Sequence, residues 1–513
     1  MTPMSDTQKT VQRVAFVSLG CPKNLVDSEK MLALLQEGGV KPVSETDHPD
    51  AIVVNTCGFL EASKQESLDV IHEAIERKKR GELKRVVVAG CLVQRHRAKL
   101  LEWAPGIDAM IGVFDRDHIV DAVRGESLER AALNGDRPPY WIAANALQAA
   151  QERGLPTVGL TVNGADGKGI GYFEGDANRF RLTPRHWAYL RASEGCNQRC
   201  AFCTIPSIRG KMRSKPMDAL LTEAGRLMDD GAFELNVIGQ DTTSWGMDIG
   251  DTRGLVGLLE GLDGVAREHG GGWIRLMYAY PSTFSSEMIH AIARLNHVVK
   301  YIDMPLQHAT DHMLTRMRRH TTADRTQQLL ENLRAAIPTI SLRTTFIVGH
   351  PGETEKDFEA LLDFVRQQRF DMVGCFKYSH EEGTPSGTMD KDASLHVPAE
   401  EAARREEALM LAQQEIAFDR AEKMARTKQQ LSLLVEGPDP EQEAGKGERV
   451  YLARASFQAP QVDSVTRLIS KREISPGELV DAVVTEAMEY DLVARPEDEV
   501  NRRVSLPMAS RRR

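Results

Sequence analysis

The chain of 513 residues is longer than one ordinary domain, so its length predicts two to four domains. Its composition, 41% hydrophobic and 27% charged, is typical of a globular protein, and no long apolar run predicts a membrane span. The first residues lack the apolar core of a signal peptide, and seven cysteines in such a chain argue against a disulfide framework. These features predict a cytoplasmic protein, and the formal net charge of −9 favours a basic partner over a nucleic acid.

Residues 1–123 repeat one pattern three times. Continuous β-branched runs end near Cys21, Cys57 and Cys91, and helix-like stretches at 27–37 and 63–80 separate these runs. This alternation predicts an α/β domain with a parallel sheet and crossover helices. The carboxyl ends of parallel strands meet at one ligand-binding edge, so the fold would gather the three cysteines there. Taken singly, each of them is more simply explained as a core residue.

Residues 124–183 give weaker patterns. The sequences GDRPP, NGADGKG and EGDAN are typical of loops, and one helix-like piece covers 142–152. We interpret this stretch as a linker or insertion and assign it no function.

Residues 184–428 contain six apolar strand candidates that alternate with helical patterns and end in a charged helix at 399–428. Six βα units predict an open or closed parallel barrel with its chemistry at the carboxyl ends of the strands. Cys375 lies in the middle of the sixth strand among apolar neighbours, which predicts a packing role.

Residues 429–500 change to short strand candidates at 430–437, 449–456, 464–470 and 479–494. Strands separated by turn residues predict a small β-barrel. The last stretch, 501–513, reads as a basic tail.

Three cysteines lie within eight residues of each other in EGCNQRCAFCTIP, directly after the first barrel strand. Cys196, Cys200 and Cys203 have the spacing C-x3-C-x2-C, which places three thiols on one loop. A tetrahedral zinc site would need a fourth ligand nearby, and His186 precedes the group by ten residues. Three thiolates on a four-iron four-sulfur cluster would instead leave one iron open for chemistry.

This spacing, with Phe202 before the last cysteine, resembles the radical S-adenosylmethionine (SAM) superfamily. The resemblance implies that the open iron binds the amino and carboxylate groups of SAM. It also implies that an electron from the cluster cleaves SAM into methionine and a 5′-deoxyadenosyl radical.

The two cysteine triads and the final small barrel together resemble the methylthiotransferase family. Its members have an amino-terminal domain with an auxiliary cluster, an open (βα)6 radical SAM barrel, which is a partial TIM barrel, and a carboxy-terminal TRAM domain. The resemblance implies two four-iron four-sulfur clusters, with SAM as a further cofactor. The implied metal ligands are Cys21, Cys57 and Cys91 in one triad and Cys196, Cys200 and Cys203 in the other.

Polar groups after the barrel strands are the candidates for SAM contacts. From their position alone we expect Gln240, Gln307 and Gly349 to bind the cofactor, together with Phe202. The sequence IVGHPGE resembles the family's glycine-bearing strand beside the adenine, and a strand, a turn and a helix explain it equally well. The basic segment 209–216 could hold substrate groups, although a solvated loop is the simpler interpretation.

The family divides into a branch that modifies adenosine in transfer RNA and one that modifies the β-carbon of an aspartate in ribosomal protein S twelve. Several stretches of this chain resemble the second branch, namely VSLGCPKNLVDSE, NTCGF, EGCNQRCAFCTIPSIRG, GQDTTSWG, MPLQHA and TTFIVGHPGETEKDFE. Two of these, CPKNLVDSE and GQDTTSWG, differ from the GCQMN-like and GQNVN-like versions of the first branch. Residues 436–499 also carry 15 acidic and 7 basic residues, a balance of −8 that suits a basic protein better than phosphates.

The resulting hypothesis is a radical SAM methylthiotransferase acting on ribosomal protein S twelve, free or within the small subunit. The resemblance implies that one SAM methylates a sulfur held at the auxiliary cluster. A second SAM yields the radical that removes the substrate hydrogen, and the carbon radical then captures the methylthio group. No catalytic side chain beyond the cluster ligands is expected, and the implied partners are a flavodoxin- or ferredoxin-type reductant and a sulfur donor.

Two alternatives remain open. The first is methylthiolation of a modified adenosine in transfer RNA. The second belongs to another class, a non-catalytic iron–sulfur electron carrier or an RNA-binding assembly factor.

Overall fold

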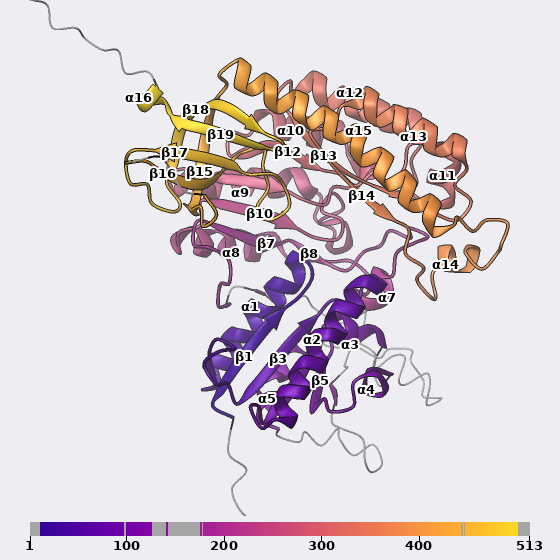
Figure 1. Cartoon of the computed structure of the whole chain (residues 1–513), viewed down its shortest axis with the longest axis vertical. Coiled ribbons are helices and arrows are strands. Elements are labelled where there is room, and N and C mark those ends of the chain that lie inside the picture. Colours follow the sequence, from indigo (N-terminus) through magenta and orange to yellow (C-terminus); the bar gives the residue numbers. More distant parts are fainter. Residues whose placement is uncertain are drawn as a thin grey trace, which may run out of the picture.

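The computed structural model has three parts in chain order (Figure 1). The amino-terminal domain lies at the bottom of this view, the large barrel lies above it, and the carboxy-terminal barrel lies at the upper left. The structure describes residues 11–96, 99–125, 140–141, 175–176, 178–442, 445 and 447–500. The helix-like piece expected at 142–152 and the tail at 501–513 lie outside the described residues.

The amino-terminal domain is a parallel sheet with helices on both faces, as predicted. Its strands are β1 (Arg13–Ser18), β2 (Lys41–Pro42), β3 (Ala51–Thr56), β4 (Arg85–Gly90), β5 (Ala109–Ile111) and β6 (Tyr140–Trp141), in the order β2-β1-β3-β4-β5-β6. The helices are α1 (Pro22–Glu37), α2 (Glu61–Lys79), α3 (Cys91–His96), α4 (Lys99–Trp103) and α5 (Ile119–Arg124). Helices α2 and α3 pack on one face, and α1 and α5 pack on the other. Every residue of β3 is therefore buried, as expected for a strand covered on both faces.

Part of the stretch interpreted as a linker belongs to this sheet. Tyr140 and Trp141 pair in parallel with Met110 and Ile111 of β5, which makes β6 the sixth strand. A two-residue strand carries little sequence pattern of its own, because strand assignment from periodicity needs about four residues or more.

The second part is an open parallel barrel. Its strands are β7 (Trp187–Arg191), β10 (Glu234–Ile238), β11 (Trp273–Leu276), β12 (Val298–Asp303), β13 (Ser341–Val348) and β14 (Met372–Lys377), in the order β14-β13-β12-β11-β10-β7. Among the described residues β7 and β14 do not pair with each other, so the barrel is open. The helices around it are α8 (Met217–Asp229), α9 (Gly254–Glu268), α10 (Ser286–Arg294), α11 (Asp311–Arg316), α12 (Ala323–Ala336), α13 (Glu355–Gln368) and α14 (Pro385–Met389).

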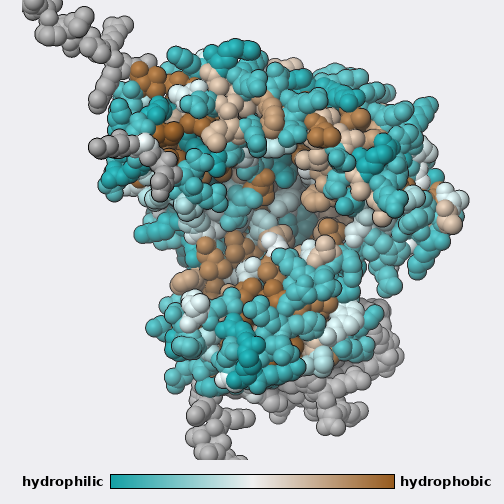
Figure 2. Space-filling model, viewed as in Figure 1, coloured by the Kyte–Doolittle hydropathy of each residue, from teal (hydrophilic) through white to brown (hydrophobic). Residues whose placement is uncertain are grey.

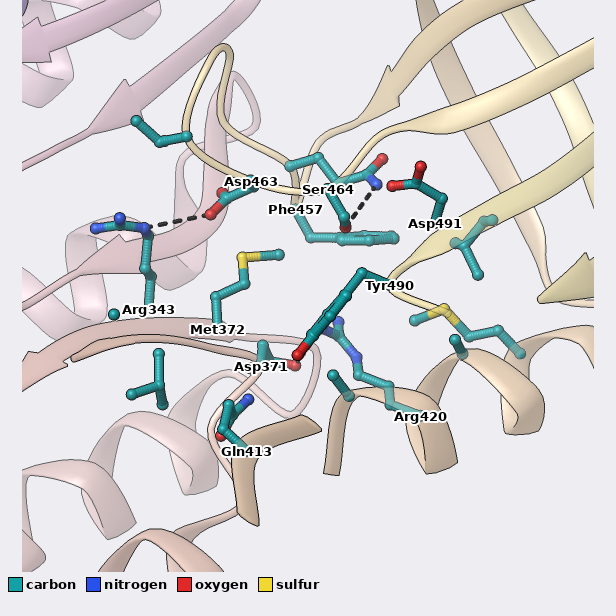
Figure 3. Close-up of a pocket in the computed structure, with 18 of the residues that line it drawn as sticks. Arg343, Asp371, Met372, Gln413, Arg420, Phe457, Asp463, Ser464, Tyr490 and Asp491 are labelled. Carbon is teal, nitrogen blue, oxygen red and sulfur yellow. Dashed lines mark hydrogen bonds and ion pairs between the residues drawn. The ribbon is translucent and has the colours of Figure 1, made fainter. Parts of the chain in front are cut away.

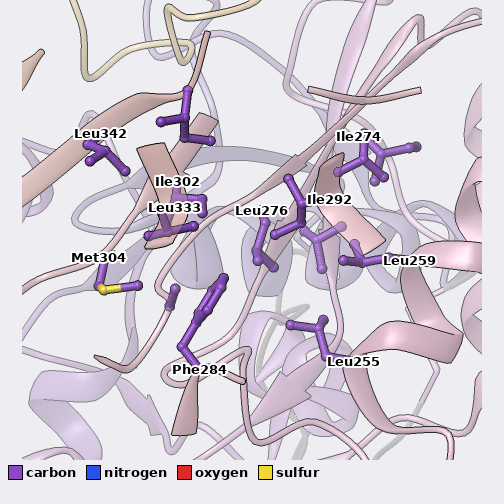
Figure 4. Packing of buried hydrophobic residues seen from close by; sticks show 14 of the residues in the cluster. Leu255, Leu259, Ile274, Leu276, Phe284, Ile292, Ile302, Met304, Leu333 and Leu342 are labelled. Carbon is purple, nitrogen blue, oxygen red and sulfur yellow. The ribbon is translucent and has the colours of Figure 1, made fainter. Parts of the chain in front are cut away.

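The largest apolar core lies between these strands and their helices (Figure 4). Alternate residues of each strand face the helices, so Ile274 and Leu276 of β11 pack with Leu259 of α9 and Ile292 of α10. Each such side chain contributes about 1.5–3 kcal/mol when fully buried. Cys375 belongs to the same core, so its predicted packing role is confirmed.

The third part begins after the long helix α15 (Ala399–Arg426), which packs on α13 and β14. Its strands β15 (Gln430–Pro438), β16 (Arg449–Ala455), β17 (Thr466–Ser470), β18 (Leu479–Met488) and β19 (Asp491–Pro496) close into a barrel in the order β15-β16-β17-β19-β18, and α16 (Glu497–Val500) follows. The single strand predicted at 479–494 is wrong, because the chain turns back at Glu489, where φ is 57°. Neither glycine nor asparagine stands at this turn, so the sequence lacks the usual hairpin signal.

The surface in Figure 2 is mostly hydrophilic. Hydrophobic residues gather over the upper part of the amino-terminal domain, beside a hollow that lies between this domain and the rest of the molecule. Within the described ranges, no helix has the length and apolar content needed to cross a bilayer.

A cavity of about 280 Å³ lies between β13, β14, α15 and the carboxy-terminal barrel (Figure 3). Its walls include Arg343 and Met372, which stand near the beginnings of their strands, so the cavity is at the opposite end of the barrel from the cysteines. Arg420 lies 5.0 Å over the ring of Phe457 and pairs with Asp371 at 2.8 Å. The charged groups on its walls therefore already have partners, and the cavity marks a seam between parts of the fold.

Candidate active site at the barrel mouth

The triad of Cys196, Cys200 and Cys203 lies on a loop at the carboxyl end of β7. The loop runs from β8 (Ser193–Glu194) to α7 (Ile205–Arg209), and β8 pairs antiparallel with β9 (Arg213–Ser214) to close its base. Gly195 begins the loop with φ of 77°, and a Cβ there would lie 2.2 Å from the carbonyl oxygen of Lys211. The predicted position after the first barrel strand is confirmed, and the loop is held at both ends.

Backbone amides support two of these thiols. The Gln198 amide donates to Cys196 Sγ at 3.4 Å, and the Ile205 amide donates to Cys203 Sγ at 3.4 Å. Burial raises the pKa of Cys196 and of Cys203 to about 12. Free thiols here would stay protonated at neutral pH and would lose their protons on coordinating a metal.

Two side chains from the barrel approach the third thiol of the loop. Arg319 Nη1 donates to Cys200 Sγ at 3.3 Å, and the Tyr280 hydroxyl lies 3.8 Å from the same sulfur. Arg319 also lies over the Tyr280 ring at 4.3 Å, and the Tyr280 hydroxyl donates to the Arg319 carbonyl. Arg319 is therefore held in place beside this sulfur by its contacts with Tyr280.

The fold brings the other three cysteines to the carboxyl edge of the first sheet. Cys21 caps α1 after β1, Cys57 follows β3, and Cys91 begins α3 directly after β4. The loops touch: Gly20 has φ of 88°, and a Cβ there would lie 2.7 Å from Cys57 Cβ. A Cβ on Gly58 would lie 2.7 Å from Leu92 Cα, beside Cys91. The expected gathering of these cysteines is therefore observed.

The first triad is also coupled electrostatically. Burial raises the pKa of Cys91 to about 12, Arg209 opposes this rise, and the thiols of Cys21 and Cys57 add to it. Arg209 Nη2 donates to Cys91 Sγ at 3.3 Å. Among the described residues no three Cys, His, Asp or Glu side chains form a site for a single metal ion. A four-iron cluster binds its thiolates through separate irons, so this finding concerns single-ion sites only.

Arg209 links the two triads. It ends α7, which follows the second triad, and its guanidinium reaches Cys91 of the first. The same guanidinium donates to Glu194 Oε2 at 2.8 Å and to Asp27 Oδ2 at 3.1 Å. Asp27 lies on α1, so this contact also ties the amino-terminal domain to the barrel.

The interpretation of segment 209–216 as a solvated basic loop is wrong, because Lys211 is the only exposed residue of this segment. Arg209 and Lys215 are each 1% exposed. Lys215 Nζ donates to Asp176 Oδ2 at 3.1 Å and to Glu223 Oε2 at 2.5 Å. Buried cations need such partners, and two of the carboxylates, Asp27 and Asp176, come from outside the barrel, where local sequence does not reveal them.

The end of the predicted linker fastens the two domains together. Asp176 accepts two bonds from Arg191 of β7, at 3.0 and 2.6 Å. Arg179 pairs with Glu29 of α1 at 3.4 Å and with Glu223 of α8 at 3.6 Å. Arg179 thus helps to hold the amino-terminal domain against the barrel.

Lys23, in the first turn of α1, also crosses from the amino-terminal domain to the barrel. Its Nζ donates to the carbonyl oxygen of Gly239 at 2.7 Å and lies 3.9 Å from the centre of the Tyr278 ring. Gly239 directly follows β10, so the ammonium stands at the mouth of the barrel. The residue is 5% exposed.

The structure places the four predicted SAM contacts at the same end of the barrel. Phe202 lies half-buried on the triad loop, and Gln240 and Gln307 follow β10 and β12. Gly349 follows β13, but a Cβ there would lie 2.5 Å from Ala402 Cβ of α15, so packing alone requires this glycine. The turn and the capped helix α13 that follow match the interpretation of IVGHPGE as a strand, a turn and a helix.

Several polar atoms at the mouth are buried without a partner in the described structure. They include Oε1 of Gln240, Oε1 of Gln307 and the hydroxyl of Tyr378. Leaving such an atom unsatisfied costs about 1–3 kcal/mol, so a polar ligand is expected to satisfy it. Two groups of three thiols and these unsatisfied acceptors fit two clusters and SAM.

Sequence reasoning missed four charged residues that organise the mouth, namely Lys23, Asp27, Glu194 and Arg319. The available signal was weak: the helix beginning CPKNLVDSE carries charges on the face that an amphipathic helix would turn to the core.

Comparison with known proteins agrees with this arrangement. Three family models match, described as "Uncharacterized protein family UPF0004" over residues 13–112, "Radical SAM superfamily" over 190–365 and "TRAM domain" over 429–496. The ribosomal protein uS12 methylthiotransferase RimO of Symbiobacterium thermophilum is 40% identical over 483 residues, covering 94% of this chain and 90% of the relative. The protein of the same name from Bdellovibrio bacteriovorus is 40% identical over 495 residues, covering 95% and 98%.

The chain belongs to the ribosomal protein uS12 methylthiotransferase family. As in other radical SAM enzymes, its barrel is an open parallel sheet, and its carboxy-terminal TRAM domain is a closed five-stranded barrel. The solved radical SAM methyltransferase TsrM from Kitasatospora setae is similar over 74% of each chain, with 15% identity and a TM-score of 0.49. None of these comparisons supports the transfer-RNA or non-catalytic alternatives over this family.

Proposed function

We propose that this chain attaches a methylthio group to the β-carbon of an aspartate in ribosomal protein uS12. Relatives that carry this activity in their name match nearly the whole chain. The observation that carries the proposal is that Arg209, which ends the helix after the second triad, donates to Cys91 of the first triad at 3.3 Å, so the two triads lie on parts of the fold that are in contact. A sulfur held at one site and a radical formed at the other can then meet the same substrate carbon.

The six cysteines are the proposed ligands of two four-iron four-sulfur clusters. Bound by Cys196, Cys200 and Cys203, one cluster would supply the electron that cleaves SAM, and the other would hold the sulfur for transfer. The chain's own groups position and shield the reactants, because such radical chemistry needs dry, fixed geometry more than an acid or base.

Individual side chains have distinct proposed tasks at the mouth. Arg319 and Arg209 offset the negative charge of the Cys200 and Cys91 thiolates, which they contact at 3.3 Å. Gln240 and Gln307 offer unsatisfied carbonyl oxygens to SAM. Phe202 and Gly349 are proposed to pack beside the cofactor.

The carboxy-terminal barrel supports a protein substrate over RNA. Each of its five arginines lies within ion-pair distance of a carboxylate of the chain, which weakens the positive potential that these groups would offer to phosphates. The pairs are Arg449–Glu473, Arg454–Glu436, Arg467–Asp439, Arg472–Glu478 and Arg495–Glu448. The excess of acidic residues suits a basic ribosomal protein, whose approach it would accelerate.

The proposal extends to partners and place of action. We infer a flavodoxin- or ferredoxin-type reductant, because the clusters need single electrons, and a separate sulfur donor that renews the transferred sulfur. A ribosomal substrate places this activity in the cytoplasm.

The test compares uS12 and transfer RNA from a strain with and without the gene. Intact-mass measurement is expected to show uS12 lighter by one methylthio group, less one hydrogen, when the gene is absent. Methylthio-adenosine in transfer RNA is expected to stay unchanged. Loss of the adenosine modification with an unchanged uS12 mass would contradict the proposal.

A further inference from the structure

Lys23 is a buried lysine without a carboxylate in direct contact. Among the described residues no Asp or Glu oxygen lies within 4.0 Å of its Nζ, although the residue is only 5% exposed. The ammonium has three N–H donors and uses one of them in a hydrogen bond to the Gly239 carbonyl. Its Nζ also lies over the ring of Tyr278. Burial lowers the pKa of Lys23, while Cys21, Glu194 and Cys91 favour its charged form from a distance. A buried ammonium normally has a carboxylate in direct contact, and among the described residues Lys23 has none.

The neighbouring cations differ from Lys23 in this respect. Arg191 contacts Asp27, Asp176 and Glu194. Arg209 contacts Asp27 and Glu194, and Lys215 contacts Asp176 and Glu223. Each of the three therefore has at least two carboxylates, and Lys23 has a carbonyl and an aromatic face.

No nearby carboxylate is available to complete the pairing. Glu194 lies within electrostatic range of Lys23. However, its two oxygens already accept from Arg191, Arg209 and Gln240 at 2.8–2.9 Å. Lys23 also stands in the first turn of α1, where the helix dipole favours anions and disfavours a cation. An external anion at this point would therefore interact favourably with both the lysine and the helix end.

The position of Lys23 matches the geometry of the proposed reaction. It lies two residues after Cys21 of the first triad and touches the end of β10, on whose loop Gln240 follows. The substrate carbon must lie between the radical and the sulfur, hence between the two triads. In an aspartate, the side-chain carboxylate is one bond from that β-carbon.

We propose that Lys23 binds the side-chain carboxylate of the target aspartate and thereby selects this residue and orients its β-carbon. This assignment rests on the proposed function and names a specificity-determining residue for it. Binding gives the ammonium a carboxylate in direct contact, and no covalent step involves the lysine.

The experiment measures the equilibrium dissociation constant of the complex between the full-length enzyme and purified uS12. The enzyme is first reconstituted with iron and sulfide and loaded with SAM, and the measurement is made under anaerobic conditions without reductant. Two forms of uS12 are compared, one with the target aspartate and one with asparagine in its place. The wild-type enzyme is expected to bind the aspartate form about tenfold to hundredfold more tightly, as for a hydrogen bond to a charged group. The variant Lys23→Met is expected to bind both forms equally, and Lys23→Arg is expected to keep part of the preference.

The matched control is Lys30→Gln. Lys30 lies on the same helix, is also buried, and has Asp117 3.6 Å from its Nζ, away from the mouth. This variant is expected to keep the wild-type preference. Iron content and SAM cleavage without uS12 are measured in parallel, and both are expected to be unchanged in Lys30→Gln.

The outcomes separate the two proposals. If Lys23→Met keeps the full preference for aspartate, or if its main defect is weaker SAM binding, the assignment of Lys23 is wrong. If Lys23→Met does not load iron, the same comparison is decided by Lys23→Gln, for which a preserved full preference also contradicts the assignment. If the wild-type enzyme with reductant leaves uS12 unmodified, the proposed function fails instead.

Discussion

The two cysteine triads differ in how the chain assembles them. Cys196, Cys200 and Cys203 lie on one loop of eight residues, closed at its base by β8 and β9. Cys21, Cys57 and Cys91 come from three strand ends and meet only because β1, β3 and β4 are neighbours in a parallel sheet. The first kind of site needs a short motif, whereas the second needs a folded domain.

This difference has consequences for how each site can be damaged. The loop triad is supported by nearby backbone amides and by Arg319, so it depends mainly on local geometry. The sheet-edge triad depends on close approach between distant loops, as at Gly20 and Cys57. It also depends on Arg209, which belongs to the other part of the molecule. Damage to the sheet-edge triad is therefore expected to leave the loop triad intact.

Removing the thiols of one triad at a time gives the largest expected effect. Replacing Cys21, Cys57 and Cys91 with alanine is expected to remove about four irons per chain and all methylthio product, while SAM cleavage persists. Replacing Cys196, Cys200 and Cys203 is expected to remove the other four or so and to abolish SAM cleavage as well. Iron analysis and 5′-deoxyadenosine measurement check both variants, and SAM cleavage by the second variant would contradict the assignment of the triads.

Adding a methyl group where the loops of Gly20 and Cys57 touch is expected to damage only the sheet-edge triad. In Gly20→Ala the new Cβ would lie 2.7 Å from Cys57 Cβ and 3.1 Å from its sulfur. We expect loss of most of the iron of that site, with SAM cleavage retained. Gly81→Ala is the matched control, because Gly81 has φ of 78° and no atom within 4 Å of the position that the new methyl group would take. It carries the same backbone strain, about 1–2 kcal/mol, without the clash. Equal iron loss in both variants would contradict the role given to the close approach.

Two arginines allow each cluster to be perturbed alone. Arg209→Lys and Arg319→Lys keep a positive charge but remove the guanidinium that contacts Cys91 or Cys200 at 3.3 Å. Because hydrogen bonds to sulfur help to set cluster potentials, each change is expected to lower one potential by on the order of 50 mV. Redox titration followed by electron paramagnetic resonance checks this, and a shift of both potentials in either variant would show that the sites are not separable.

The smallest expected effect concerns the hydroxyl of Tyr280. It lies 3.8 Å from Cys200 Sγ, at the long end for a contact to sulfur, and Tyr280→Phe keeps the ring beneath Arg319. The potential of the SAM-binding cluster is therefore expected to change less than in Arg319→Lys, with iron content unchanged. If Tyr280→Phe changed this cluster potential more than Arg319→Lys did, the Tyr280 contact would be the stronger of the two, which would contradict this prediction.

Much of the fold could be predicted from the sequence because its strands are continuous apolar runs separated by helical periods. The loop triad could also be predicted, because the spacing of its three cysteines is a local feature of the sequence. The ion-pair network at the mouth could not be predicted, because Asp27, Asp176 and Arg209 lie far apart in the chain. The hairpin at Glu489 was missed because the left-handed turn has no glycine or asparagine. Local sequence patterns thus identified the helices and strands. Which charged side chains are buried together is decided only when those helices and strands pack.

The central claim is that both triads act on one carbon of one substrate. The most direct test incubates the reconstituted enzyme, SAM and reductant with uS12 that carries deuterium on the β-carbon of its target aspartate. We expect deuterium to appear in 5′-deoxyadenosine and the same uS12 molecules to gain one methylthio group. Methylthio uS12 that retains all of its deuterium, or deuterium transfer to 5′-deoxyadenosine by an intact enzyme without any methylthio product, would contradict it.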